Sequence, residues 1–184
     1  MSLNMYKLRQ IGNGYNQMCY FKSIDDSRRY FKYFIENKEI NFSKHLYPTL
    51  IAQTGYSENF IKQLDFINCV LPIPIFSQRF VETIGNKIED ELQFYPCSIL
   101  VRNKKIDFYI GKIIKYKEII DLKHSGRRQL TDGTFIPDIP YFYKRQKEDY
   151  YIIRDSTYKS HYIVSDFFKQ LCMNLKMSFL EVNK

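Results

Sequence analysis

Residues 98–122 read SILVRNKKIDFYIGKIIKYKEIIDL, and this is the most strand-like stretch of the chain. β-Branched and aromatic side chains, which favour the extended backbone of a sheet, run through all of it. The pair Asn103-Lys104 interrupts the run and is typical of a turn. The stretch therefore predicts strands on either side of a turn, and it puts a sheet at the centre of the expected fold.

The N-terminal region predicts a hairpin followed by a helix. Residues 5–21 contain Asn13 followed by Gly, a pair that can take the positive φ of a tight turn. Residues 23–39 have an apolar face at helical spacing, and Asp25 or Asp26 is the expected N-cap. The apolar face of this predicted helix consists of Tyr30, Phe31, Phe34 and Ile35.

One pattern occurs twice, as IFSQRFVETIG at 75–85 and as YIVSDFFKQLC at 162–172. In both, a serine follows an extended apolar segment and precedes a helical period. A serine in that position caps the helix by accepting a hydrogen bond from an amide of the first turn. The alternative, a nucleophile, would need a GxSxG or SxxK motif, and neither Ser77 nor Ser165 has one. The pattern predicts two strand–cap–helix units and no catalytic serine.

The remaining segments complete the expected fold. Residues 45–64 predict a short strand and a short helix, and residues 124–140, with two Gly and two Pro, predict a turn-rich loop. Residues 149–155 and 161–164 predict a second hairpin, and residues 178–182 a final strand. We expect an α+β fold with a mainly antiparallel sheet and a few short helices.

Length and composition are typical of one globular domain spanning residues 1–184, with a hairpin and helix region over 1–64 and a core over 65–184. The four cysteines lie far apart in the sequence among apolar neighbours, a pattern that favours buried free thiols. The three histidines form no local metal-binding motif. We therefore expect neither a metal nor another cofactor. No apolar run is long enough to span a bilayer, and the N-terminus lacks the pattern of a signal peptide. These observations predict a cytoplasmic protein.

Most of the net charge of +8 comes from residues 99–130, which contain nine lysine and arginine residues and three aspartate and glutamate residues. A basic segment of this kind suggests an acidic partner. Three interpretations remain open: the solvent side of a sheet that carries Lys112, Lys115 and Lys117, a protein-binding face, or a nucleic-acid-binding surface. The last would use the interleaved aromatic residues to stack bases, although the sequence contains no RNA-binding or helix-turn-helix motif.

Residues 64–182 present their features in a fixed order. An extended segment enters the helix capped by Ser77, a strand ends in Asp121 with Ser125 four residues on, Ser165 and Asp166 open a second helix, and Phe179 lies in a short last strand. This order resembles the MXAN-type immunity domains, a family of bacterial immunity proteins encoded beside polymorphic toxins. The family's frequent glycine before the last strand is replaced here by Lys176-Met177.

The resemblance implies a non-enzymatic protein that binds a cognate toxin and blocks it, with residues 65–184 as the immunity-like core. Because this chain is basic, the expected partner is a toxin with an acidic surface; the alternative is a basic nucleic-acid-binding accessory protein. Tyrosine and arginine are frequent at interface hot spots, and the loop over 134–151 is rich in aromatic residues. We therefore predict an exposed partner-binding set of Arg127, Arg128, Tyr141, Tyr143 and Arg145.

Overall fold

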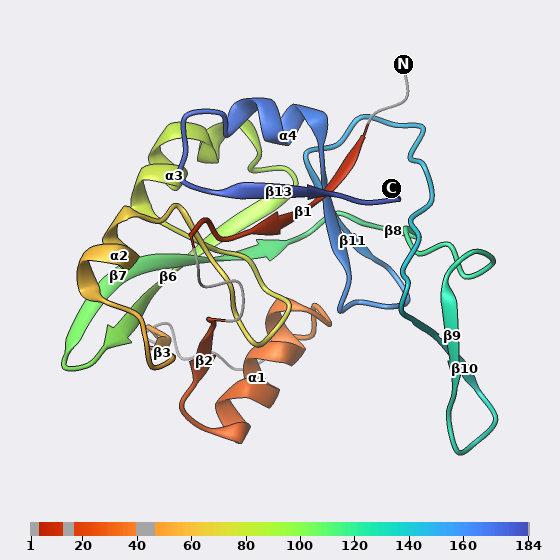
Figure 1. Cartoon of the computed structure of the whole chain (residues 1–184), viewed down its shortest axis with the longest axis horizontal. Helices are drawn as coiled ribbons and strands as arrows, with labels where there is room; N and C mark the ends of the chain where they lie inside the picture. The colour runs from red at the N-terminus through yellow and green to blue at the C-terminus, as the bar shows by residue number, and fades with distance from the viewer. Residues whose placement is uncertain (1–3, 13–16, 40–46, 184) are drawn as a thin grey trace.

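The computed structural model describes residues 4–12, 17–39 and 47–183. Over these residues the chain forms an α+β fold of two large sheets, a separate two-stranded hairpin and four short α-helices (Figure 1). The helices are α1 (Ile24–Phe34), α2 (Glu58–Gln63), α3 (Gln78–Ile84) and α4 (Asp166–Leu171), and a 3-10 turn, η1 (Gly85–Lys87), follows α3. The predicted fold class is confirmed.

The six-stranded sheet is built on β6 and β7, which include most of the strand-like stretch over residues 98–122, and its strand order is β2-β3-β6-β7-β5-β4. All neighbours pair antiparallel except β3 and β6. Val101 pairs with Lys104, so the tight turn consists of Arg102 and Asn103, one residue earlier than predicted, and Arg102 has the positive φ of 55°. The strands are β2 (Cys19–Phe21), β3 (Thr49–Ala52), β4 (Phe66–Ile67), β5 (Ile75–Phe76), β6 (Leu92–Val101) and β7 (Lys104–Ile113).

The five-stranded sheet has the order β13-β1-β12-β11-β8, and only β11 and β8 pair in parallel. The predicted hairpin between β11 and β12 and the predicted final strand are both present. Strand β1 lies between β12 and β13, so residues 1–64 and 65–184 share this sheet. The strands are β1 (Met5–Arg9), β8 (Tyr116–Lys117), β11 (Ile152–Asp155), β12 (Tyr162–Ser165) and β13 (Ser178–Glu181).

The predicted hairpin over residues 5–21 is wrong, because β1 and β2 belong to different sheets. Met5, Tyr6 and Leu8 are buried on β1, and pairing with β12 and β13 provides that burial, which a local hairpin would not. Asn13 and the glycine after it lie outside the described residues. The burial of β1 between distant strands therefore decides its pairing, and the local turn pattern does not.

The predicted loop over residues 124–140 is also wrong in part, because it contains a hairpin of β9 (Gly126–Gln129) and β10 (Phe135–Asp138). This hairpin, called the arm below, projects away from the two large sheets (Figure 1). Phe135 on the arm and Ile139 directly after it are exposed, with 56% and 78% of their surface accessible. The arm forms one wall of the site described below.

Serines cap all four α-helices. Ser77 accepts from the Phe80 amide and Ser165 from the Phe168 amide, as predicted. At α1 the cap is Ser23, which accepts from Asp26, and not Asp25 or Asp26. A serine one residue before the helix has the extended backbone that a cap needs, whereas both aspartates already lie in the first turn.

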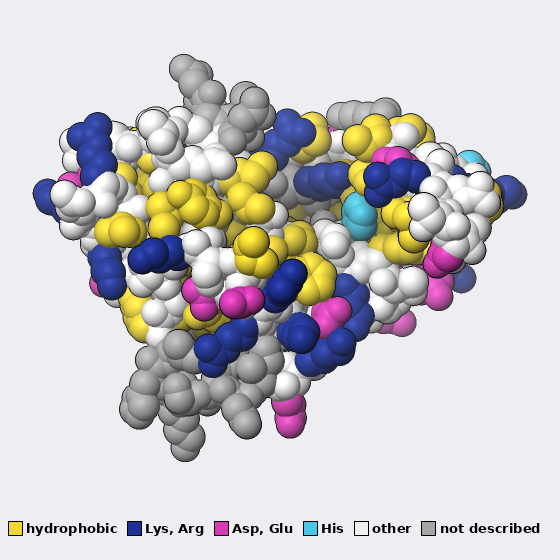
Figure 2. Space-filling model, turned by 90° about the horizontal axis from the view of Figure 1, so that it is seen from below, with side chains coloured by type: hydrophobic (Ala, Val, Ile, Leu, Met, Phe, Trp, Pro, Cys, Tyr) yellow, Lys and Arg dark blue, Asp and Glu magenta, His cyan; other side chains and the backbone are white. Residues whose placement is uncertain are grey.

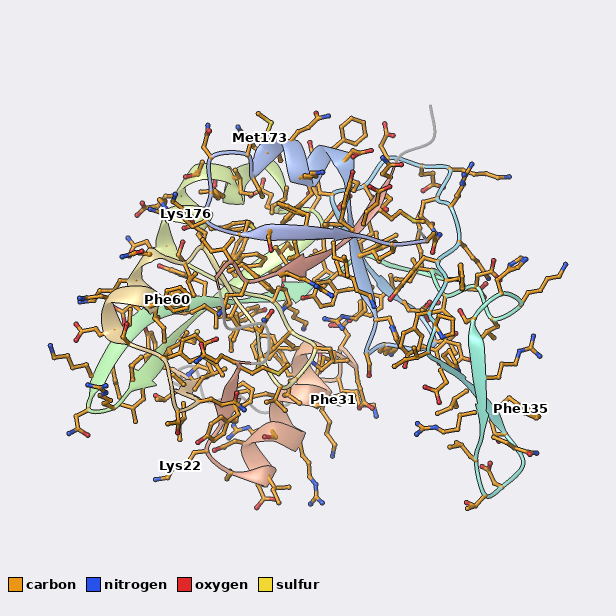
Figure 3. The ribbon with its side chains drawn as sticks, in the orientation of Figure 1. Lys22, Phe31, Phe60, Phe135, Met173 and Lys176 are labelled. Carbon is orange, nitrogen blue, oxygen red and sulfur yellow. The ribbon has the colours of Figure 1, made fainter. Side chains whose placement is uncertain are left out.

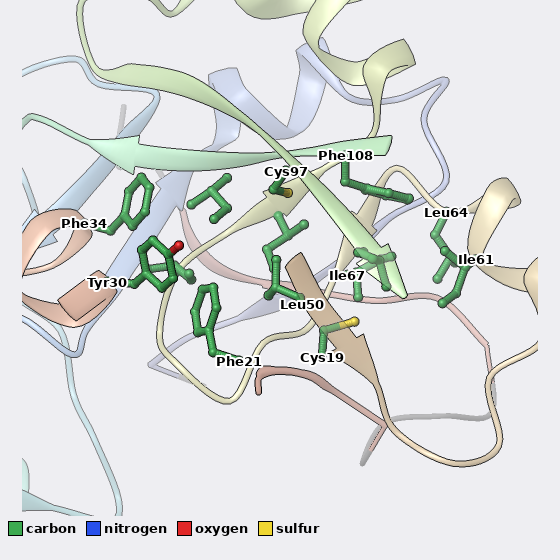
Figure 4. Packing of buried hydrophobic residues seen from close by; sticks show 14 of the residues in the cluster. Cys19, Phe21, Tyr30, Phe34, Leu50, Ile61, Leu64, Ile67, Cys97 and Phe108 are labelled. Carbon is green, nitrogen blue, oxygen red and sulfur yellow. The ribbon is translucent and has the colours of Figure 1, made fainter. Parts of the chain in front are cut away.

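The core lies on both faces of the six-stranded sheet. On one face, α1 and α2 pack side chains such as Phe34 and Ile61 against the strands, as Figure 4 shows. On the other, Phe80 of α3 and Phe168 of α4 pack between the two sheets. The four cysteines are free, and all but Cys69 are buried.

Candidate protein-binding groove

Three adjoining hollows form one groove between α1, the arm and the turn that joins β11 to β12. The central hollow, of about 430 Å³, is lined by Phe31, Arg128, Tyr141 and the turn residues 157–161. It shares Phe31 and Glu36 with a hollow of about 320 Å³ on α1, and Ser160 and His161 with a hollow of about 270 Å³ beside β1. We call the three hollows together the groove.

The charges along the groove are unequal, since five cations and a single carboxylate, Glu36, line it among the described residues. Figure 2 views this side of the molecule and shows lysine or arginine side chains and a histidine around a recess beside the projecting lobe. Glu36 forms an ion pair with Lys38 at 2.8 Å. Arg28 and Arg128 lie 3.9 Å and 3.8 Å from Asp25 and Asp138, so the attraction of the groove for anions comes mainly from its three lysines. Its five cations are Lys7, Arg28, Lys32, Arg128 and Lys159.

The α1 end of the groove has an apolar floor formed by Ile24, Phe31 and Leu71. Ile24 is 70% exposed and Val70, next to Leu71, is 57% exposed. Phe31 of α1 and Ile136 of the arm both line the central hollow. Figure 3 labels Phe31 on α1 and Phe135 on the arm. Exposed apolar side chains beside cations are typical of a surface that contacts another protein.

The β1 end of the groove is cationic and aromatic. The Nζ atom of Lys7 lies 5.4 Å from the ring centroids of both Tyr141 and Tyr143. The His161 ring lies 4.6 Å from the Tyr141 ring, and its Nδ1 is 3.4 Å from the Tyr143 hydroxyl. Burial, and then the nearby Lys7, lower the pKa of His161 below its ordinary value, so the imidazole is mainly neutral at pH 7.

The structure brings only part of the predicted partner-binding set together. Arg128, Tyr141 and Tyr143 line the groove. Arg127 is exposed and donates to the Leu122 carbonyl, and Arg145 is exposed outside the three hollows. Tyr143 is buried, with 3% of its surface accessible, so the prediction that it is exposed is wrong: its backbone pairs with Ile120, and its ring packs in the core cluster that contains Ile120 and Ile163.

The basic segment over residues 99–130 does not form one patch. Lys104 and Lys105 lie at the β6–β7 tip, whereas Arg127 and Arg128 lie on the arm, at the other side of the molecule (Figure 1). Lys112 is buried, with its Nζ 3.8 Å above the Tyr33 ring, so it is not on the solvent side of the sheet. Ion pairs to Glu58, Glu91, Glu148 and Asp138 involve four of the nine cations, Lys104, Lys115, Lys117 and Arg128.

Of the five groove cations only Arg128 was predicted; Lys7, Arg28, Lys32 and Lys159 were not, and neither was His161. Lys7 and His161 come from opposite ends of the chain, and only the pairing of β1 with β12 brings their strands together. Lys159 reaches the Glu36 carbonyl across the groove at 3.3 Å. No local pattern marks these residues, since a lysine that alternates with apolar side chains on a strand is equally typical of the solvent side of a sheet.

The residues that carry the family resemblance make local structural contacts. Asp121 accepts from the amides of Lys123 and His124, and Ser125 accepts from the Phe142 amide. Asp166 accepts from the Tyr6 hydroxyl at 2.7 Å. These contacts hold turns and helix ends in place.

Within residues 4–12, 17–39 and 47–183, no group of three or more His, Cys, Asp or Glu side chains is arranged to hold a metal ion. In the same ranges, no helix combines the length and apolar character needed to cross a membrane. No protein-family model matches the chain, and no curated protein matches it.

Proposed function

We propose that this chain is a non-enzymatic immunity protein of the cytoplasm that neutralises a cognate toxin by binding an acidic part of its surface in the groove. The observation that carries the proposal is the excess of five cations over one carboxylate around a floor that is apolar at one end. The order of features over residues 64–182 supports a toxin as the partner.

Charge and shape support a protein partner. A concave cationic surface accelerates the approach of an acidic partner and rejects a basic one, and its apolar floor adds contact area. The exposed side chains on the arm and α1 provide both types of contact at the two walls. A toxin segment that alternates acidic and apolar side chains would match both the cations and the apolar floor of the groove.

The runner-up function, nucleic-acid binding, is favoured by one observation: Tyr141 and His161 form a ring pair near Arg128 in the central hollow. Aromatic rings beside cations can stack bases and contact phosphates. The apolar floor at the α1 end favours a protein, because Ile24, Phe31 and Leu71 add contact area for apolar side chains and none for a phosphate backbone.

The test is a binding measurement with the protein that co-purifies from the native host or is encoded beside this chain. We expect a stable complex, suppression of the partner's toxicity, and about tenfold or more weaker binding for Arg128→Glu combined with Lys159→Glu, since rim charges act through a screened field. A gel shift with random-sequence DNA and RNA at physiological salt runs in parallel. Tight nucleic-acid binding without a protein partner contradicts the proposal.

The matched control is Lys104→Glu combined with Lys105→Glu. It makes the same change in net charge at the exposed β6–β7 tip, away from the groove. If both double variants weaken the complex equally, the effect comes from overall charge and the groove is not the binding surface.

A further inference from the structure

The β1 end of the groove contains a cation that forms no ion pair within the described part of the chain. Lys7 is half-buried on β1, and no Asp or Glu among the described residues, which include every Asp and Glu of the chain, lies within ion-pair distance of its Nζ. Burial, and then the neighbouring Arg9, lower the pKa of Lys7 below its ordinary value. Burial removes water from the ammonium group, and no anion replaces that water. The free energy of the charged form is therefore raised.

A second cation without a carboxylate partner among the described residues lies on β11, which is separated from β1 by β12. Arg154 is fully buried, and its guanidinium donates to two backbone carbonyls, those of Lys159 and Pro72. Its Nε has no hydrogen-bond partner. Burial lowers the pKa of Arg154 to about 10, so this side chain remains a cation at neutral pH and adds to the positive potential around His161.

Asp155, the carboxylate that acts on His161, is occupied by the backbone. Its Oδ2 accepts from the amides of Ile119 and Ile120, and its Oδ1 accepts from those of Thr157 and Tyr158. These four bonds fix the turn between β11 and β12 and take up the lone pairs of both oxygens. Asp155 favours protonation of His161, whereas Lys7 and Arg154 oppose it.

The hollow beside β1 has the size and lining of a side-chain pocket. Its volume is about 270 Å³, and its lining combines Lys7, Ser160 and His161 with the apolar surfaces of Leu8, Tyr143 and Tyr162. A carboxylate would meet the ammonium and imidazole groups, while methylene groups behind it would contact the aromatic walls.

We propose that the hollow lined by Lys7 and His161 is a subsite for a carboxylate group of the partner, an aspartate or glutamate side chain that binds between the ammonium and the imidazole. This subsite deepens the proposed function and rests on it for the identity of the partner. A bound carboxylate supplies the counter-ion that Lys7 lacks. It also favours the protonated imidazole, so binding takes up protons and tightens as the pH falls through the pKa of His161 in the complex.

The direct test uses the full chain and two probe peptides, acetyl-Ala-Glu-Ala-amide and its uncharged match acetyl-Ala-Gln-Ala-amide, at equal ionic strength. Nuclear magnetic resonance follows the Lys7 side chain and the His161 ring during titration. We expect the glutamate peptide, at tens of millimolar, to shift both signals and raise the pKa of His161, and the glutamine peptide to do neither. Lys7→Met abolishes the response, and Lys105→Met, an exposed lysine outside the groove, preserves it.

Inorganic phosphate is the third probe. If phosphate shifts the two signals and the glutamate peptide does not, the subsite is one for phosphoryl groups and the proposal is overturned. Equal responses to the glutamate and glutamine peptides, or no response to either, also overturn it.

The partner complex separates this inference from the proposed function. Because removing one member of a desolvated charge pair is costly, we expect Lys7→Met to weaken the complex about thirtyfold or more. If Arg128→Glu with Lys159→Glu weakens the complex while Lys7→Met does not, the groove binds the partner and the carboxylate subsite is wrong. If the glutamate peptide binds but no protein partner is found, the subsite stands and the proposed function fails.

Discussion

Asp65 and Lys7 are charged side chains that the fold removes from water to different extents, and they differ in what surrounds them. Asp65, just before β4, is fully buried and accepts hydrogen bonds from Ser77, from Arg79 and from the Lys176 amide. Lys7 is half-buried beside two tyrosine rings and has no carboxylate partner among the described residues. The protein satisfies the first charge itself and leaves the second to a ligand.

This difference distinguishes a structural charge from a binding charge. Asp65 connects the start of α3 to the segment that leads into β13, so its partners come from two distant parts of the chain. Its removal should damage the fold, whereas the removal of Lys7 should damage binding alone.

Asp65→Ala should cause the largest loss of stability. The change removes one buried charge and leaves the Lys176 amide and the Ser77 hydroxyl without their acceptor, at a cost of about 3 kcal/mol in the free energy of unfolding. Urea denaturation followed by circular dichroism measures the loss. Asp65→Asn keeps the volume and is the control; a loss under about 1 kcal/mol for the alanine variant would show that Asp65 is not a structural charge.

The same carboxylate predicts acid sensitivity. Burial alone would raise the pKa of Asp65, but the hydrogen bonds from Arg79, Ser77 and the Lys176 amide lower it below its ordinary value. A depressed pKa in the folded state contributes stability above the unfolded-state pKa, and this contribution is lost as the pH falls through the folded value. The free energy of unfolding should therefore fall less steeply in acid for Asp65→Asn than for the natural chain. Parallel slopes would exclude Asp65 as a source of acid sensitivity.

The two cap serines should differ in the size of their effect. Ser165 is fully buried, and its hydroxyl also donates to the Tyr150 carbonyl, so Ser165→Ala leaves two buried groups unsatisfied and should cost about 2 kcal/mol. Ser77 is partly exposed, and Ser77→Ala should cost about 1 kcal/mol. Thermal and urea denaturation of the two variants measure the difference. The reverse order would mean that the bond from Ser77 to Asp65 is worth more than burial at Ser165.

The sequence predicted the features that short segments determine. The β6–β7 pair and the caps at Ser77 and Ser165 depend on patterns within a few residues, and the structure contains all three. The separation of β1 from β2 was not predicted, because it depends on burial against strands near the other end of the chain.

Site prediction from sequence fails for the same physical reason. The contact between the Lys7 and His161 regions forms only after β1 pairs with β12, and strand alternation could not decide which aromatic residues after the arm point inward. Arg128 and Tyr141 were found from their composition, while the buried ring of Tyr143 was placed on the wrong side.

Lys7→Met should have the smallest effect on stability. Two opposing terms nearly cancel: the variant loses attraction to two rings at 5.4 Å, about 0.5–1 kcal/mol, and it gains relief from the desolvation of an unpaired ammonium group. We expect the free energy of unfolding to change by less than about 0.5 kcal/mol at pH 7, as for substitutions outside structural networks. Urea denaturation measures this change beside Arg79→Met, which removes the partner of buried Asp65 and should be clearly destabilising. If the two variants lose equal stability, Lys7 is a structural cation like Arg79, and the contrast that assigns it to a ligand disappears.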